Sequence, residues 1–233
     1  MGKWLYGLVG LSLWCVGVTS ADEGIWIIKE DFVRLGKKEL YEQYIGKEGK
    51  DKKFPLYAYA MESAPDYVCL VPVSSFADID TLEGDEQKLQ KTAAQILSSA
   101  LNFRMSSIHR EITSAIPALN EQIPFSEKLT MVHYWTYGIA PAAAGPFEEH
   151  IAQKLSKQKE GRGKTCWRVW RALYGSDTPR YVIAVFCETK EESQKVVSSI
   201  DFITPISREI IRNTKEGDGV FRMDLSSLGG ESG

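Results

Sequence analysis

The chain contains the stretch AMESAPDYVCLV at residues 60–71, and its pattern returns as YGSDTPRYVIAV at residues 174–185. Each copy consists of an apolar strand, a short polar turn, a proline, any residue, Tyr-Val and a second apolar strand. An offset of 114 residues carries Pro65 onto Pro179. Internal repetition at a fixed offset is typical of chains built from two similar units. We therefore expect a β-hairpin at matching places in two halves of the chain.

Strand and helix patterns around the two hairpins follow the same order. The first half has an apolar run at 25–32, helical spacing in 40–45, the hairpin, a helical stripe over 89–101 and a strand at 106–112. The order βαββαβ is the split βαβ, or ferredoxin-like, motif. The second half repeats it with a strand at 131–137, helix positions 147–155, strands at 167–173 and 181–187, helix positions 196–203 and a strand around 221–225.

Two such units would solve a packing problem. A four-stranded sheet with helices on one face leaves the other face uncovered, and two sheets facing each other cover both. We expect an α+β fold of two tandem ferredoxin-like units, whose antiparallel sheets pack face to face as a pseudo-dimeric α/β barrel, either closed or as a sandwich. The expected boundaries are unit 1 at 22–113, a linker at 114–128, unit 2 at 129–225 and a disordered tail at 226–233.

Residues 1–21 have the form of a secretory signal peptide. Lys3 precedes an apolar run from Trp4 to Val18, and small residues follow at 19–21. The run is shorter than the roughly 20 residues of a membrane-spanning helix, although a retained anchor is the alternative. We expect a secreted or periplasmic protein with no membrane association after cleavage.

The charge balance bears on the class of partner. The chain has 28 Lys and Arg against 31 Asp and Glu, a formal net charge of −3. Nucleic-acid binding draws on a basic excess, which this composition lacks. We therefore expect no nucleic-acid partner.

Three cysteines would remain after removal of residues 1–21, so at most one internal disulfide is possible. A hairpin that turns between Gly175 and Pro179 would place Arg171 opposite Val182 and, in the same register, Cys166 opposite Cys187. Directly opposed strand residues are close enough for a disulfide. We expect a Cys166–Cys187 bridge, with two buried thiols as the alternative.

The first strand is followed by VRLGKKELY at residues 33–41, which is similar to the strand, Val-x-Pro-Gly and acidic-aromatic helix that open monooxygenase-like domains. On these residues the chain resembles the dimeric α/β-barrel superfamily, including antibiotic-biosynthesis-monooxygenase-like, NIPSNAP-like and chlorite dismutase proteins. Leu35 departs from the usual proline, and the second half keeps only IAP at 139–141. The resemblance implies a cavity in each half, which different members use for polyketides, haem or nothing known.

Motifs of the common catalytic machines are missing from the sequence: it has no phosphate-binding glycine loop, Gly-x-Ser-x-Gly, His-Glu-x-x-His or clustered Cys/His spacing. No metal site is expected. Aromatic and histidine residues instead concentrate in the second half. Alternation places His133, Trp135 and Tyr137 on one sheet face, close to Arg171 on the next strand. Such a face could hold a flat aromatic ligand, or His133 or His150 could ligate haem iron.

The alternative is that these rings fill the core, and we favour it for Trp135, Trp167 and Trp170. Aligning the halves matches His133 with Trp26 and Arg171 with Tyr57, so the halves differ where function is expected. The candidate ligand-binding residues are His133, Trp135, Tyr137, Arg171 and Tyr57, and the candidate catalytic residues are His133 and Arg171.

The sequence thus favours an exported protein that binds a small hydrophobic or aromatic molecule, without an evident catalytic set. A haem-dependent or cofactor-free, monooxygenase-like oxidoreductase is the first alternative, and a structural or interaction protein is the second. Both a monomer with pseudo-dimeric halves and a homodimer are compatible with the pattern.

Overall fold

The computed structural model describes residues 25–33, 36–50, 55–64, 66–81, 104–115, 128–158, 165–174, 178–202 and 210–227. Its strands are β1 (Ile25–Val33), β2 (Tyr57–Met61), β3 (Tyr67–Val73), β4 (Arg104–Ala115), β5 (Met131–Ile139), β6 (Cys166–Tyr174), β7 (Arg180–Cys187) and β8 (Ile211–Phe221). Its helices are α1 (Lys38–Lys50), α3 (Ala144–Gln158) and α4 (Lys190–Ser199), with single turns η4 (Pro141–Ala143) and η6 (Met223–Leu225). Residues 76–81 are also helical. The predicted signal peptide, the whole predicted 89–101 helix and most of the predicted linker and tail lie outside the described residues.

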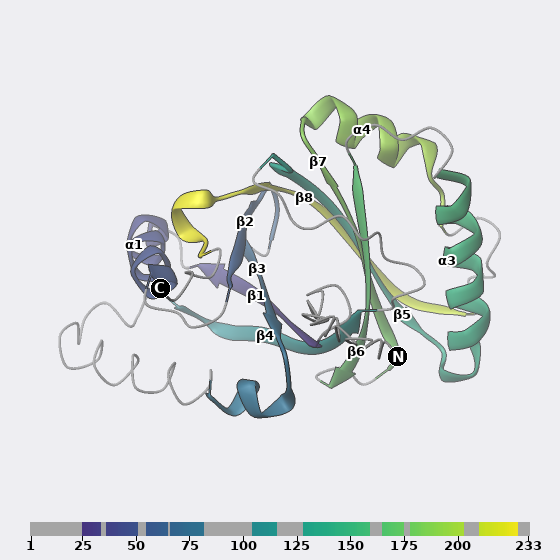
Figure 1. Ribbon diagram of the computed structural model, residues 1–233, viewed down its shortest axis with the longest axis horizontal. Coiled ribbons are helices and arrows are strands. Elements are labelled where there is room, and N and C mark those ends of the chain that lie inside the picture. Colours follow the sequence, from purple (N-terminus) through teal and green to yellow (C-terminus); the bar gives the residue numbers. More distant parts are fainter. Residues whose placement is uncertain are drawn as a thin grey trace, which may run out of the picture.

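The eight strands form one closed antiparallel barrel in the order β1-β3-β2-β8-β5-β7-β6-β4 (Figure 1). The strands of the first half therefore run β4-β1-β3-β2, and those of the second half run β8-β5-β7-β6 in the same relative order. The halves join where β2 pairs with β8 and where β4 pairs with β6. The predicted α+β antiparallel architecture is confirmed, and the barrel is the closed one of the two arrangements considered.

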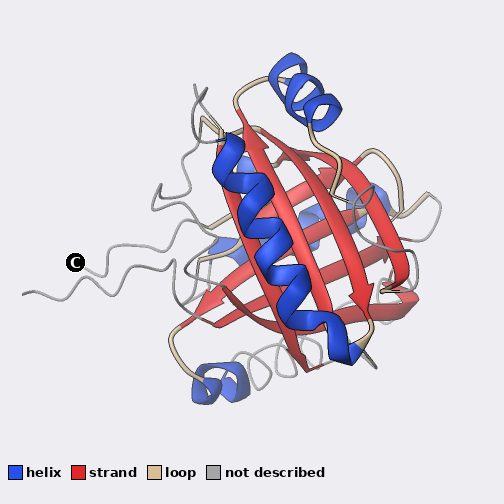
Figure 2. Cartoon of the chain, turned by 90° about the vertical axis from the view of Figure 1, so that its right-hand side faces the viewer, coloured by secondary structure: helices blue, strands red, loops and turns tan. Residues whose placement is uncertain are grey.

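Helices cover the outside of the barrel. Helix α1 lies beside the first-half strands, and α3 and α4 lie beside the second-half strands (Figure 1). Turned by 90°, the molecule shows α3 running diagonally across the outer face of the sheet (Figure 2). The buried apolar residues accordingly form one cluster inside the barrel and one under the helices of each half.

Alternation along each strand assigns side chains to the interior or to the helix side. On β5, Val132 and Tyr134 belong to the interior cluster, whereas Trp135 and Tyr137 belong to the cluster under α3 and α4. All nine residues of β5 are buried, because both faces of the strand are covered. Hydrophobicity alone therefore cannot distinguish its two faces.

Strand register corrects the predicted match between the halves. Ile27 pairs with Val71 in the first half, and His133 pairs with Val185 in the second. Val185 lies 114 residues after Val71, the offset of the repeated hairpin, so His133 corresponds to Ile27 and not to Trp26. By the same reasoning Arg171, which pairs with Tyr181, corresponds to Ala60, the partner of Tyr67, and not to Tyr57.

The tyrosine of each repeated hairpin ties the sheet to the first helix of its half. The Tyr67 hydroxyl donates to Glu42 on α1 at 2.5 Å, and the Tyr181 hydroxyl donates to Glu148 on α3 at 2.7 Å. An arginine contacts each carboxylate: Arg222, which follows β8, contacts Glu42 at 2.5 Å, and Arg171 on β6 contacts Glu148 at 3.3 Å. The repeated Tyr therefore has a structural role in both halves.

The last strand and last helix differ in position from the prediction. Strand β8 comprises residues 211–221, and the apolar alternation expected to form a strand at 221–225 falls largely in the turn η6. Gly217 and Gly219 of β8 are buried, whereas most of its other residues are exposed or half-buried. The strand therefore lacks the apolar alternation by which a strand is predicted from sequence. Helix α4 begins at Lys190, before the predicted helix positions 196–203, because Thr189 and Glu192 form a capping box at its N-terminus.

The predicted Cys166–Cys187 disulfide is wrong. Both residues are buried thiols that form no disulfide, and the same holds for Cys69. Cys166 pairs with Phe186, one residue away from the expected partner. A shift of one residue sends a side chain to the opposite sheet face. Cys166 consequently faces the barrel interior, while Cys187 faces the helices.

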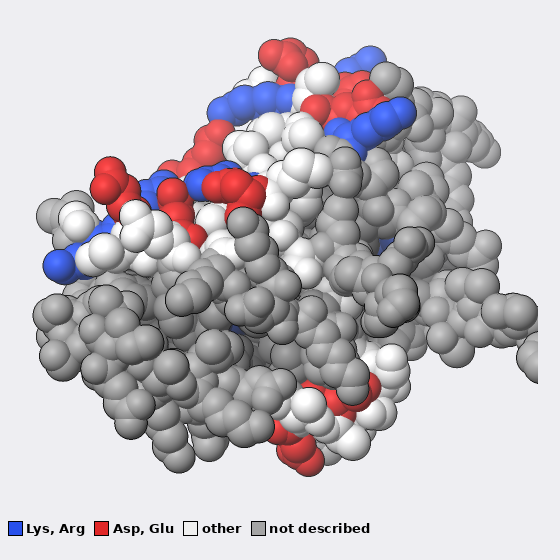
Figure 3. Space-filling view, turned by 60° about the vertical axis from the view of Figure 1, so that its left-hand side comes forward, with Lys and Arg blue, Asp and Glu red and all other residues white. Residues whose placement is uncertain are grey.

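Charged side chains of both signs are intermixed on the described part of the face turned forward in Figure 3. This distribution matches the near-balanced composition of 28 basic and 31 acidic residues. The absence of a nucleic-acid partner stays a prediction. Among the described helices, none is long and apolar enough to cross a membrane.

Candidate functional site

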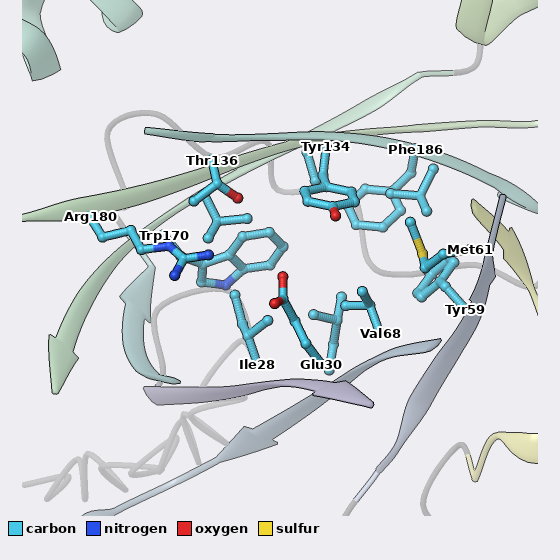
Figure 4. A pocket seen from close by; sticks show the side chains of 14 residues that line it. Ile28, Glu30, Tyr59, Met61, Val68, Tyr134, Thr136, Trp170, Arg180 and Phe186 are labelled. Atoms are coloured by element: carbon cyan, nitrogen blue, oxygen red, sulfur yellow. The ribbon is translucent and has the colours of Figure 1, made fainter. Parts of the chain in front are cut away.

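A cavity lies inside the barrel (Figure 4). Its volume is about 30 Å³, counted as the space open to the centre of a water molecule. One buried water needs about 10–15 Å³ by this measure, so the cavity is larger than a single-water void. Both halves contribute lining residues: Ile28, Glu30, Tyr59, Met61, Val68 and Leu70 from the first, and Val132, Tyr134, Thr136, Trp170, Arg180, Val182, Ala184 and Phe186 from the second.

Polar groups interrupt the apolar lining in one region. Glu30 on β1 projects its carboxylate into the cavity, and Arg180 at the start of β7 projects its guanidinium from the other half (Figure 4). Lys215 on β8 contacts Glu30 Oε1 at 3.0 Å and thereby connects the halves. Lys215 is paired with Thr136, which also lines the cavity. The site is therefore an apolar chamber with one charged corner.

Trp170 brings an unused hydrogen-bond donor to this corner. The residue is 1% exposed, and its indole Nε1 is buried with no hydrogen-bond partner. Buried indole N–H groups usually have a partner. In Figure 4 the nitrogen edge of the indole is turned toward the part of the cavity where the Glu30 carboxylate lies. A donor and an acceptor therefore border the same space.

Two lining tyrosines remain protonated at neutral pH. Burial raises the pKa of the Tyr134 phenol far above its usual value, and the nearby Glu30 charge adds to the rise while Arg180 opposes it. Burial likewise raises the pKa of the Tyr59 phenol. These hydroxyls can donate hydrogen bonds but do not supply phenolate.

Glycines on β8 make room for the lining. A Cβ at Gly217 would lie 2.9 Å from Cε1 of Tyr134, and one at Gly219 would lie 2.6 Å from Sδ of Met61. Real Cβ atoms do not approach so closely. Larger residues at these positions would push two lining side chains out of place, so the glycines set the shape of the cavity.

All five of the predicted ligand-binding residues lie outside this cavity. His133, Trp135 and Tyr137 face the helix side of β5, where Trp135 stacks on Trp167 at 6.1 Å between ring centroids. Arg171 is 48% exposed and contacts Glu148 on α3. Tyr57 packs beside the interior cluster against Trp26, with 6.4 Å between centroids, but does not line the cavity. The predicted set is therefore not one site.

His133 nevertheless has an unusual environment. Its side chain is 6% exposed, and Nδ1 lies 2.8 Å from Asp218 Oδ1 on β8. The other ring nitrogen, Nε2, is buried without a partner. The Trp135 ring lies edge-on to the imidazole at 4.3 Å between centroids. The Asp218 carboxylate thus holds the His133 imidazole in place, and the Trp135 ring packs beside it.

His150 occupies α3 and does not line the cavity either. Burial lowers the pKa of its imidazole, and the charge of Lys154 lowers it further. The third histidine, His109, lies on β4, whose backbone alone is described.

The lining does not fit a haem. Iron ligands in haem proteins are histidine, cysteine thiolate, methionine or tyrosine. Among the described lining residues there is no histidine or cysteine, and the high pKa values of Tyr59 and Tyr134 disfavour tyrosinate, which leaves only Met61. The volume is also far below that of a porphyrin. Among the described residues, no group of three or more His, Cys, Asp or Glu could hold a metal ion.

Sequence reasoning missed the charged corner. Glu30 and Arg180 stand next to apolar runs, where a charged residue usually marks the end of a strand. Trp170 was predicted to be a core residue. One signal was available, since Ile28 and Glu30 share a face that Lys29 does not. A charge on the same face as apolar residues of a buried strand calls for a partner.

Known proteins were compared by family model, by sequence and by fold. No family model and no curated protein matches the chain. An anthrone oxidase-like protein has a TM-score of 0.64 at 9% identity, covering 91% of this chain and 96% of its own. A candidate monooxygenase from Lactobacillus acidophilus has a TM-score of 0.59 at 10% identity, covering 89% and 97%. A haem-binding protein from Thermus thermophilus has a TM-score of 0.50 at 14% identity, covering 87% and 92%.

At these identities the likeness concerns the fold alone. The chain has the ferredoxin-like α+β barrel fold of these proteins, which confirms the fold that its resemblance to monooxygenase-like domains implied. A NIPSNAP-like relationship stays a prediction.

Proposed function

We propose that the protein binds a small, mainly apolar molecule inside the barrel. The observation that carries this proposal is the cavity between the halves, lined by aliphatic and aromatic side chains with a single charged corner. Ligand sites commonly combine an apolar lining with a few convergent polar groups. The site differs from the face of His133, Trp135 and Tyr137 that the sequence suggested.

The cavity limits the size of the ligand. The space open to the centre of a water molecule is about 30 Å³. Extending a compact space of this size by the radius of water on all sides gives a full cavity volume of about 150 Å³, which suits roughly ten non-hydrogen atoms. A single aromatic ring with one or two substituents meets this limit. Large polycyclic molecules do not.

Toluene is a suitable first probe, because it is apolar and smaller than the limit. We expect isothermal titration calorimetry to detect its binding to the full chain, together with a rise in Tm. Ala184→Leu adds three carbon atoms to the lining and should weaken toluene binding at least about tenfold. Ala142→Leu, at an exposed position of η4, is the matched control and should bind toluene like the unaltered protein. Failure of the unaltered protein to bind, or equal binding by the Ala184→Leu variant, would contradict the proposal.

A haem-dependent oxidoreductase is the second candidate function. It is favoured by the contact between His133 and Asp218, since iron-ligating histidines usually donate their other ring nitrogen to a carboxylate or carbonyl. His133 does not line the barrel cavity, and that cavity is too small for a porphyrin, so we expect no Soret band on haem titration. A Soret band lost in His133→Ala would revive this candidate. A cofactor-free oxidoreductase would act on a ligand of the barrel and would need it to bind first.

Export and a monomeric state complete the proposal. Export is supported by the form of residues 1–21, and N-terminal sequencing of the protein from the extracellular or periplasmic fraction tests it. A monomer is supported by the barrel, because each half covers the exposed sheet edges of the other within one chain. Light scattering on the eluting protein should give one chain per particle. If neither probe nor haem binds, a structural or interaction role is favoured instead.

A further inference from the structure

We propose that the ligand of the barrel is an uncharged molecule with one hydroxyl group, which the Trp170 indole N–H and the Glu30 carboxylate hold between them. This inference rests on the proposed binding function and specifies its ligand. A ring or compact alkyl body would fill the apolar remainder of the cavity.

The first argument is the facing donor and acceptor. Trp170 Nε1 is a buried donor without a partner, and Glu30 is a buried carboxylate whose Oε1 is held by Lys215. A hydroxyl oxygen accepts one hydrogen bond while its proton donates another. One hydroxyl can thus satisfy both groups, whereas a carbonyl accepts from Trp170 but offers nothing to Glu30.

The second argument is charge. Among the described residues, the lining carries one negative group, Glu30, and one positive group, Arg180. A ligand carboxylate would lie against the Glu30 carboxylate, and a ligand ammonium would lie near Arg180 and leave the Trp170 N–H without an acceptor. Burying either charge without a good partner costs several kcal/mol in general. A neutral ligand avoids both conflicts.

The third argument is that the corner is positioned before a ligand arrives. Lys215 holds Glu30 at 3.0 Å, and Trp170 packs against Trp26 at 5.8 Å between ring centroids. Glu30 and Trp170 come from different halves and are each fixed by a neighbour. A site whose polar groups are fixed rejects a ligand that cannot pair with them, since the rejected ligand leaves them buried and unsatisfied.

Four probes of similar size test the inference on the full chain. They are p-cresol, toluene, benzoate and benzylammonium, titrated by calorimetry at low and at physiological salt. We expect p-cresol to bind about tenfold or more tightly than toluene, and both ions to bind more weakly than p-cresol.

Matched variants assign the preference to this corner. Trp170→Phe keeps a ring and removes the donor, so p-cresol affinity should fall about five- to tenfold while toluene affinity changes less than about twofold. Trp167→Phe is the control, because Trp167 is a neighbouring buried tryptophan of β6 that faces the helices. It should leave the ratio of the two affinities unchanged. Glu30→Met should lower the ratio as Trp170→Phe does.

The results separate the two proposals. If toluene binds as tightly as p-cresol to the unaltered protein, the hydroxyl inference is wrong while the binding function stands. Tighter binding of benzoate or benzylammonium than of p-cresol would also overturn it. If none of the four probes binds, the proposed function fails as well. The comparison on unaltered protein decides the inference even if a variant does not fold.

Discussion

The two halves place different chemistry at matching positions beneath their helices. In the first half, Lys29 Nζ lies 3.5 Å from Asp31 Oδ2, and the Tyr41 hydroxyl donates to the same oxygen at 2.5 Å. All three residues are buried between β1 and α1. The first half therefore has a polar cluster inside its outer core.

An offset of 106 residues, the one that relates Ile27 to His133, leads to the second half. There the three positions are occupied by Trp135, Tyr137 and Phe147, all buried. The rings of Tyr137 and Phe147 pack at 5.5 Å between centroids. An ion pair and its hydrogen bond have become an aromatic cluster without a change in strand order.

The two halves keep the same fold although these buried residues differ, so contacts other than these must specify the fold. A buried ion pair is roughly equivalent in stability to well-packed apolar residues of similar volume, provided that both partners are present. What the halves share is the hairpin tyrosine bound to a helix glutamate, Tyr67 to Glu42 and Tyr181 to Glu148. The conserved geometry of the two halves thus follows the hairpin and its helix contact rather than the core composition.

The largest expected effect is at the aromatic cluster. Trp135→Ala should lower the free energy of unfolding by about 4 kcal/mol, because it leaves a cavity among Trp167, Phe202 and His133. Urea denaturation measures it. Phe76→Ala is the control, since Phe76 is 50% exposed, and should cost less than about 1 kcal/mol. Equal effects at the two positions would contradict this account of the core.

The polar cluster should respond somewhat less. Asp31→Ala leaves Lys29 buried without this carboxylate and should cost about 3 kcal/mol. The double variant Lys29→Leu with Asp31→Leu removes both charges and should recover most of that loss, as in the second half. Urea denaturation of both variants, with the exposed Asp80→Ala as reference, makes the comparison. A double variant less stable than the single one would show that the first half depends on its ion pair.

The shared hairpin contacts should matter equally in both halves. Tyr67→Phe and Tyr181→Phe each remove one hydroxyl that donates to a carboxylate, and each should cost about 1–2 kcal/mol. Thermal denaturation followed by calorimetry would measure both. A loss in one variant only would break the equivalence of the hairpins.

The smallest expected effect depends on pH. The hydrogen bond from Arg222 is the main cause that holds the pKa of Glu42 below its ordinary value of 4.5. The folded state therefore favours the carboxylate, and this stabilisation is present at neutral pH and lost as the pH falls below 4.5 through the lowered pKa.

Arg222→Met should consequently lower Tm more at pH 7 than at pH 3. Arg171→Met removes the arginine partner of Glu148, which is more exposed than Arg222. It should lower Tm by less than Arg222→Met does, because exposed ion pairs contribute about 0–1 kcal/mol. Tm measured across this pH range for both variants, with the exposed Arg212→Met as reference, would sharpen the comparison. A Tm difference for Arg222→Met that grows toward acid would contradict the assigned sign.

The repeat and the hydrophobic spacing were enough to predict the α+β class and the order of the described strands with α1, α3 and α4, whereas the predicted 89–101 helix lies outside the described residues. They could not give the register, because strands such as β5 are buried on both faces and a slip of one residue leaves the pattern equally apolar. That slip accounts for the wrong disulfide and for matching His133 with Trp26. Nor could the sequence show that the aromatic face of β5 points toward the helices, because that depends on which face of the sheet the barrel encloses.

The cavity was beyond the sequence for a related reason. Trp170 and Arg180 lie on the paired strands β6 and β7, but Glu30 lies on β1, which meets those strands only across the closed barrel, so no spacing along the chain brings Glu30 to them. His133, by contrast, attracted attention through its aromatic neighbours on one strand. Local clustering identified a core, whereas the candidate site depends on the contact between halves.

The joining of the halves at β2–β8 and β4–β6 also has a consequence during synthesis of the chain. The first half leaves the ribosome with Trp26, Ile28, Tyr59 and Leu70 on a sheet face that, in the part of the chain that the structure describes, the second half covers. Its partner strand for β2 is the last of the eight to be made, at residues 211–221. An apolar face must therefore wait in solution for nearly the whole chain, so this protein is most exposed to aggregation, and to chaperones, just before it is complete.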